Sequence, residues 1–270
     1  NQKDERFLKL KVALPFLSSK RLELGFGIAQ IEDRYFQNNV IDFDKDKYDK
    51  SGYRLFGGSV SFNGSTLNSR QFPIQGAREA LVAQIFTGNE SFRPGVNSEN
   101  KKPVKEKHSW LQLSYMKEKY HKMGANWILG WYLDAVYASK NFSENYTATM
   151  MQASEFAPTA HSKLTYNEAF RANQYVAAGI RPIYRLNQMF HVRGEFYGFL
   201  PIFPIERNSI NKAYYGKAFS RFEYLGEISV VCQLPFGAIS AYVNHYSSPR
   251  REWNVGLTLG WQLFNYRFIE

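Results

Sequence analysis

The sequence predicts an all-β fold, a transmembrane antiparallel β-barrel of which about eleven strands are visible. Apolar and polar side chains alternate with period two through most of the 270 residues, which places them on opposite faces of strands. Aromatic residues make up 17% of the chain and many stand near predicted strand ends, as in the aromatic girdles of membrane barrels. Short and long connections alternate, as the periplasmic turns and extracellular loops of such barrels do.

The last predicted strand, residues 253–264, has the clearest pattern. Its length suits a tilted bilayer crossing of roughly 9–11 residues, and its two tryptophans stand about 27 Å apart at ~3.3 Å per residue. A strand of a soluble β-sandwich with one buried face is the alternative for this stretch alone. One face carries Trp253, Val255, Leu257, Leu259, Trp261 and Leu263, and the other carries Asn254, Gly256, Thr258, Gly260 and Gln262.

Ten further strands are predicted upstream by the same alternation. In residues 22–31, for example, Leu24, Phe26 and Ile28 oppose Glu23 and Gly25. The predicted ranges are 7–17, 22–31, 53–63, 77–86, 108–119, 126–138, 168–184, 189–200, 218–234 and 238–246.

The connections between these strands favour the barrel over the sandwich, which gives no reason for alternating lengths. Short turns cover 18–21, 64–76, 121–125, 185–188 and 235–237, and long loops cover 37–52, 87–107, 139–167 and 201–217. The alternation predicts a bacterial outer-membrane location with Glu270 at the periplasmic side and Asn1 at the extracellular side. Eleven strands would leave an open edge, which a membrane sheet does not tolerate, so we expect residues 1–270 to be part of one larger barrel domain.

Charge and cysteine content narrow the function classes. Lys and Arg exceed Asp and Glu by 34 − 24 = 10, but the charges are scattered through loops and alternate strand positions, so we expect no nucleic-acid partner. Outer-membrane lipids and lipopolysaccharide are the predicted partners. Cys232 is the single cysteine, which excludes a disulfide framework and a thiolate metal site. We expect no cofactor.

Basic residues in the second long loop have two interpretations. They form a solvated loop, or they bind lipopolysaccharide phosphates. The residues are Lys101, Lys102, Lys105 and Lys107.

Charged residues on the polar faces of the later strands predict a network inside the barrel. Opposite charges in a confined, water-filled lumen would pair with one another. The network would then be purely structural; the alternative is that it holds the long loop in place or guides an exported passenger. Its predicted members are Arg171, Arg181, His191, Arg193, Glu195, Arg221 and Glu223, with Glu227 beside them.

Catalytic and metal-binding groups are not expected in this chain. Ser240 and Asn244 share a strand face, but His245 has the opposite parity, which fails the geometric test for a nucleophile and its base. We identify only His191 with Glu195 as a histidine and carboxylate on one strand face, and expect them in the charged network.

The longest loop, 139–167, is predicted to fold over or into the barrel mouth. It contains Phe142, Met150, Met151 and Phe156 but few charged side chains, and that much apolar area exposed to water is a liability. We expect it to contact polar strand faces that bear Arg171, Arg193 or Arg221; a free extracellular loop is the alternative.

One motif resembles a known family. Residues 63–76 read N-G-S-T-L-N-S-R-Q-F-P-I-Q-G, and Phe72, Pro73, Gly76 and Arg78 resemble the F-P-T-x-G-x-R signature of bacterial surface antigen barrels, the superfamily of outer-membrane assembly and secretion proteins. The resemblance implies a sixteen-stranded barrel with five strands upstream of this chain, and a long loop that enters the lumen three strands after the motif.

A second resemblance covers most of the chain. Residues 145–163, 170–179 and 260–265 are similar to the barrel of patatin-like outer-membrane phospholipases. This resemblance implies a lipid acyl hydrolase (patatin) domain and a small periplasmic domain before the barrel, which would anchor and export the hydrolase.

Two departures qualify these resemblances. The loop 139–167 lacks the V-R-G-F/Y tip of the assembly proteins, and Gly57-Gly58-Ser59-Val60-Ser61 lacks the closing glycine of the patatin G-x-S-x-G motif. We therefore expect enzyme activity, if any, outside this chain. The alternatives are a non-enzymatic outer-membrane protein assembly or translocation barrel and a soluble β-rich binding protein. The sequence leaves homo-oligomerisation open.

Overall fold

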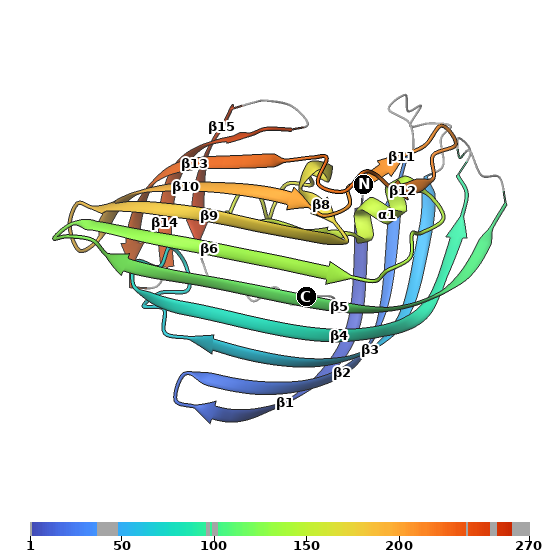
Figure 1. The fold of residues 1–270 in the computed structure, drawn as a ribbon, viewed down its shortest axis with the longest axis horizontal. Helices are drawn as coiled ribbons and strands as arrows, with labels where there is room; N and C mark the ends of the chain where they lie inside the picture. The colour runs from blue at the N-terminus through green and yellow to red at the C-terminus, as the bar shows by residue number, and fades with distance from the viewer. Residues whose placement is uncertain are drawn as a thin grey trace.

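The chain folds into a strongly curved antiparallel sheet of eleven strands (Figure 1). The computed structural model describes residues 2–36, 48–95, 98, 102–235, 237–248 and 253–260. The sheet order is β1-β2-β3-β4-β5-β6-β9-β10-β13-β14-β15. The strands are β1 (Gln2–Leu17), β2 (Lys20–Tyr35), β3 (Asp49–Ser65), β4 (Gly76–Arg93), β5 (Val104–Lys122), β6 (Trp127–Ala138), β9 (Gln174–Arg185), β10 (Phe190–Pro201), β13 (Glu223–Leu234), β14 (Gly237–Tyr246) and β15 (Trp253–Gly260).

Each of the eleven predicted strands has a counterpart in this sheet, and the predicted all-β fold class is confirmed. Tight turns lie at one end of the strands, and the longer connections, with α1 and β12, lie at the other (Figure 1). Consecutive strands of the sheet pair with each other, and β1 and β15 are its edges. No pairing joins these two edges within the described residues.

Several predicted boundaries were wrong. The predicted loop 87–107 is shorter than expected, because β4 continues to Arg93 and β5 begins at Val104. Residues 87–91 of β4, Thr-Gly-Asn-Glu-Ser, and residues 105–107 of β5, Lys-Glu-Lys, contain no large apolar side chain, and the pair Phe92–Val104 near the strand ends is the apolar exception. Without an apolar face, hydrophobic alternation does not mark a strand. Residues 37–47, Lys101, Trp261, Leu263 and Glu270 lie outside the described residues.

The predicted strand 168–184 was also wrong at its start. It begins with a 3-10 turn, η1 (Glu168–Phe170), because the Asn167 side chain accepts a hydrogen bond from the Ala169 N–H at 2.9 Å. Short elements complete the fold: α1 (Tyr146–Gln152), β7 (Ser154–Glu155), β8 (Arg171–Ala172), β11 (Ile205–Arg207) and β12 (Ala213–Tyr215). β7 pairs with β8, and β11 with β12. The predicted strand 218–234 begins only at Glu223.

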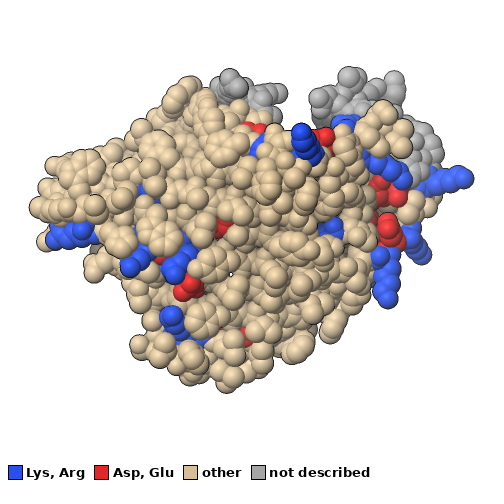
Figure 2. Space-filling model, in the orientation of Figure 1, with Lys and Arg blue, Asp and Glu red and all other residues tan. Residues whose placement is uncertain are grey.

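The outer face of the sheet is apolar along every strand. Leu10 of β1 is 70% exposed and Leu257 of β15 is 80% exposed, although both are large apolar side chains. On the visible face, Lys, Arg, Asp and Glu lie mainly toward the two ends of the strands and leave a broad uncharged area between them (Figure 2). The outward set includes Leu8, Val12, Phe26, Ile28, Phe56, Val60, Leu81, Ile85, Leu111, Leu129, Val176, Ile180, Phe196, Ile228, Val230, Ile239, Val243, Val255 and Leu259.

The inner face holds the buried core. Phe156, from the connection between β6 and β9, packs among rings of the sheet, with its centroid 5.7 Å from Phe199 and 6.1 Å from Tyr175. A second cluster near the long-loop end includes Trp110, which stacks on Phe86 at 4.8 Å. The long connection therefore adds apolar side chains to the core that the strands' inner faces form.

Helical content is small. α1 is seven residues long, and no helix in the described part of the chain combines the length and the apolar character needed to cross a bilayer.

Candidate functional site

A buried charged cluster lies on the inner face of the sheet, between β5, β9 and β10. Strand alternation points Glu118, Tyr120, Arg181 and Arg193 inward from these strands. Arg181 forms an ion pair with Glu118, and both arginines donate to the Tyr120 hydroxyl, at 2.6 Å from Arg181 Nη1 and 3.0 Å from Arg193 Nη2. One tyrosine therefore links two guanidinium groups.

Glu195 completes this cluster. Its carboxylate forms an ion pair with Arg193 and accepts a hydrogen bond of 2.6 Å from the Tyr197 hydroxyl. The Tyr197 hydroxyl in turn accepts from Arg181 Nε at 2.7 Å. Buried charges are tolerated when they are paired and hydrogen-bonded, and this cluster meets both conditions.

Residues 66–75, between β3 and β4, contain Phe72 and Pro73 and are called the motif turn here. The motif turn contacts this charged cluster. Arg193 Nη1 donates to the Pro73 carbonyl oxygen at 2.8 Å, and Leu67 and Ile74 pack against a buried cluster containing Tyr120 and Ile183. The turn therefore folds against the inner face rather than extending away from the strand ends.

The other motif residues shape the turn. Gly76 has φ +92°, and a Cβ there would lie 2.1 Å from the Thr66 carbonyl oxygen, so only glycine fits. Phe72 has φ 47°, in the left-handed region. Asn68 Oδ1 accepts from the N–H groups of Ile74 and Gln75, both at 3.0 Å. Arg78 is exposed near the start of β4.

The connection between β6 and β9 folds against the inner face, as its composition predicts. Asn145 caps α1 and also donates to the Tyr35 hydroxyl of β2 at 2.7 Å. Ser143 and Tyr53 of β3 share a hydrogen bond of 2.8 Å between their hydroxyls. Gln152 donates to the buried Asp33 carboxylate. This connection therefore bridges to strands far from it in sequence.

Arg171 belongs to this connection, in the short strand β8, rather than to a strand of the eleven-stranded sheet. Its guanidinium pairs with Glu155 at 3.0 Å and donates to the carbonyl oxygens of Met150, Met151 and Ala153 at 3.3–3.4 Å. It thereby satisfies carbonyl groups at the C-terminal end of α1, which have no partner within the helix.

The predicted charged network is thus distributed over separate places. Arg181, Arg193 and Glu195 meet in one cluster. Glu223 pairs with Arg221 at 2.7 Å and accepts from Ser247. His191 is buried, and its Nε2 has no hydrogen-bond partner among the described residues. Glu118, Tyr120 and Tyr197 were not among the predicted members, because a cross-strand partner is known only once the register is known.

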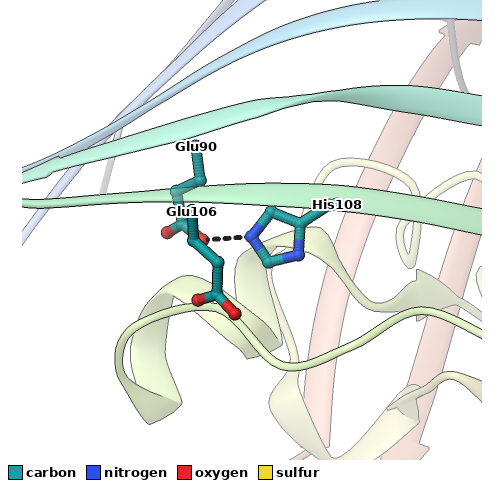
Figure 3. Close-up of side chains that lie close together, drawn as sticks. All are labelled: Glu90, Glu106 and His108. Atoms are coloured by element: carbon teal, nitrogen blue, oxygen red, sulfur yellow. Dashed lines mark hydrogen bonds and ion pairs between the residues drawn. The ribbon is translucent and has the colours of Figure 1, made fainter.

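One group of side chains has the donor set of a metal site. Glu90 of β4 and Glu106 and His108 of β5 lie on the inner face with their ligand atoms within 4.8 Å of one another (Figure 3). His108 Nε2 lies 2.8 Å from Glu90 Oε2, so the two share a hydrogen bond. Imidazole and carboxylate are ligands of zinc and related divalent ions. Glu106 and His108 were not predicted as a pair, although they stand two residues apart on one strand and share its inner face.

Burial shifts the pKa of groups in the long connection. Lys140 is buried, with Nζ 4.7 Å from the Trp110 ring centroid, and desolvation lowers its pKa to about 8. Burial also lowers the pKa of His161, whose Nδ1 lies 2.8 Å from the Tyr246 hydroxyl. Burial raises the pKa of Tyr146 to about 12.

Ser240, Asn244 and His245 do not form a hydrolytic triad. Ser240 and Asn244 are buried on the inner face of β14. His245 points to the other face, where its ring lies 4.9 Å from that of Trp253. Alternation along the strand thus separates the candidate base from the candidate nucleophile.

Comparison with models of known protein families finds no match to this chain. Comparison with curated proteins also finds none.

Proposed function

We propose that this chain is an outer-membrane β-barrel domain, with its C-terminal end at the periplasmic side, that anchors and exports a lipid acyl hydrolase. One observation carries the membrane part of the proposal. Large apolar side chains are exposed on the outer face of every strand of the sheet, while the buried charged cluster and the long connection lie on the inner face. Soluble monomers rarely expose apolar patches larger than a few hundred Å², whereas membrane barrels carry such a band.

The barrel in this proposal has sixteen strands and closes with segments beyond the eleven strands of this sheet. Support comes from β1 and β15, the edges of the sheet, which have no pairing partner on their outer sides among the described residues. An open edge leaves backbone groups without partners, which costs several kcal/mol per group in lipid. The alternation of tight turns and longer connections supports the orientation, because barrels of this class have short periplasmic turns.

The hydrolase part of the proposal rests on the resemblance of residues 145–163 and 170–179 to the barrels of patatin-like phospholipases. In this proposal a patatin domain and a periplasmic domain are covalently linked to the barrel, and membrane lipids and lipopolysaccharide surround it. The serine nucleophile lies in the patatin domain.

A second candidate function is a non-enzymatic assembly or translocation barrel. The observation that favours it is the motif turn, which resembles that of assembly barrels and reaches the buried charged cluster through the bond from Arg193 to Pro73. In this alternative no hydrolase domain is attached.

Two measurements test the proposal. The protein should fractionate with outer membranes and require detergent for extraction; monomeric behaviour in water without detergent would overturn the membrane assignment. The coding sequence on the N-terminal side of this chain should contain a G-x-S-x-G patatin segment, and tandem periplasmic repeats without it would favour the assembly barrel. This chain alone should release no fatty acid from phospholipid vesicles, and robust release would place the active site in the barrel.

A further inference from the structure

A row of five polar side chains crosses the outer face of β1 to β5 near their long-loop end. The strand register aligns Arg6 with Gln30, Gln30 with Arg54, Arg54 with Asn89, and Asn89 with Lys107. Neighbouring strands lie about 4.8 Å apart, so Arg6 and Lys107 each stand about 10 Å from Arg54, with an amide side chain between.

An apolar row lies directly beside the polar row. The same register aligns Leu8 with Ile28 and Ile28 with Phe56, one outward position closer to the middle of the strands. These side chains are 62%, 57% and 55% exposed. Both rows line an open cavity of about 760 Å³ on the outer face. The cavity therefore has a cationic side and an apolar side.

The charge of the cavity is unbalanced. Among the residues that the structure describes, no acidic side chain lines it. Arg6 pairs with Asp4 at 3.3 Å on the surface, but within the described ranges no ion pair joins Arg54 or Lys107 to a carboxylate. Guanidinium, ammonium and amide donors arranged in a row match an anion with several acceptor oxygens, which is the chemistry of a phosphate group.

We propose that this cavity binds a phosphorylated glycolipid of the outer leaflet, the lipid A type. Its phosphates contact Arg54 and Lys107, and its acyl chains lie against Leu8, Ile28 and Phe56. The inference rests on the proposed membrane function, since the long connections mark this end of the strands as extracellular. A free phosphate would use the cations alone and leave the apolar row without a role.

The test uses the full-length protein extracted in a mild detergent and incubated with purified bis-phosphorylated lipid A. Native mass spectrometry counts the lipid retained. The double variant Arg54→Gln/Lys107→Gln should bind about tenfold less tightly, because each ion contact at an exposed site is worth up to about fivefold in affinity. The matched control, Lys119→Gln/Lys122→Gln, removes two exposed charges at the opposite end of β5 and should bind as the parent does.

Two further binding measurements show which part of the lipid is recognised. Dephosphorylated lipid A should bind about as weakly to the parent as bis-phosphorylated lipid A does to the double variant, and inorganic phosphate should not compete. Equal binding by parent and double variant, or by both lipids, would overturn the proposal, and so would competition by inorganic phosphate. A protein that needs detergent but fails these tests disproves the lipid site alone. A protein that is monomeric in water disproves the membrane function as well.

Discussion

Arg193 on β10 donates a hydrogen bond of 2.8 Å to the carbonyl oxygen of Pro73, which lies 120 residues earlier in the turn after β3. Both guanidinium and carbonyl are buried, and the same guanidinium pairs with Glu195. A single side chain thus joins the motif turn to the charged cluster on the inner face.

Replacing Arg193 with Met should destabilise the fold by about 3–5 kcal/mol, because it leaves the Glu195 carboxylate buried without its pair. Urea unfolding in detergent measures the loss, and protease cleavage within residues 66–75 should become faster. Arg185→Met, on the neighbouring strand and partly exposed, is the control and should lose less than 1 kcal/mol. The double variant Arg193→Met/Glu195→Gln should lose less than Arg193→Met, and an equal effect of Arg193→Met and Arg185→Met would contradict this interpretation.

Phe156 holds the long connection against the inner face. It is 2% exposed, and Phe156→Ala should weaken the docking of residues 139–170 by about 3–5 kcal/mol through lost burial and a cavity. Limited proteolysis of intact cells measures this as faster cleavage within residues 156–163. Leu164→Ala, at a side chain that is 86% exposed, should leave the cleavage rate unchanged. Rapid cleavage of the parent protein itself would show that the connection is a free loop.

Lys140 should make this docking depend on pH. Its pKa is about 8 when buried, against an ordinary value of 10.5, so the undocked form binds more protons between these values. Docking is therefore least favourable below pH 8 and strengthens as pH rises toward 10.5. Hydrogen exchange of residues 139–170 across this range measures the effect. Lys140→Met should remove the pH dependence and protect the connection already at pH 7; a retained dependence would assign it to another group.

The cost of placing an arginine on the outer face should depend on the depth of that position in the bilayer. Ile180 lies midway along β9 and its side chain is 52% exposed. The variant Ile180→Arg should lose about 2–4 kcal/mol of folding free energy in a bilayer. Tyr137→Arg, near the long-loop end of β6, should change the folding free energy by only about 0–1 kcal/mol. Folding into phospholipid vesicles under urea measures both. Small and equal effects would be the behaviour of side chains exposed to water, contrary to the proposal.

Local sequence determined the strands and their faces. In residues 253–260 the alternation of Val255, Leu257 and Leu259 with small or polar residues assigns the outer face, because successive side chains of a strand point to opposite sides. The same parity argument separated Ser240 from His245. It could not find the long-loop ends of β4 and β5, where residues 87–91 and 105–107 carry no large apolar side chain.

The tertiary structure decided which inward side chains meet. Arg181 reaches Glu118 and Arg193 reaches Pro73, pairs that are separated by 63 and 120 residues, and no local pattern encodes them. Arg171 is a charged residue like the predicted network members, but it follows η1, lies in the short strand β8 and pairs with Glu155 of β7. Side-chain parity is a property of neighbouring residues in one strand, whereas partners depend on the register of several strands and on where a long connection folds back.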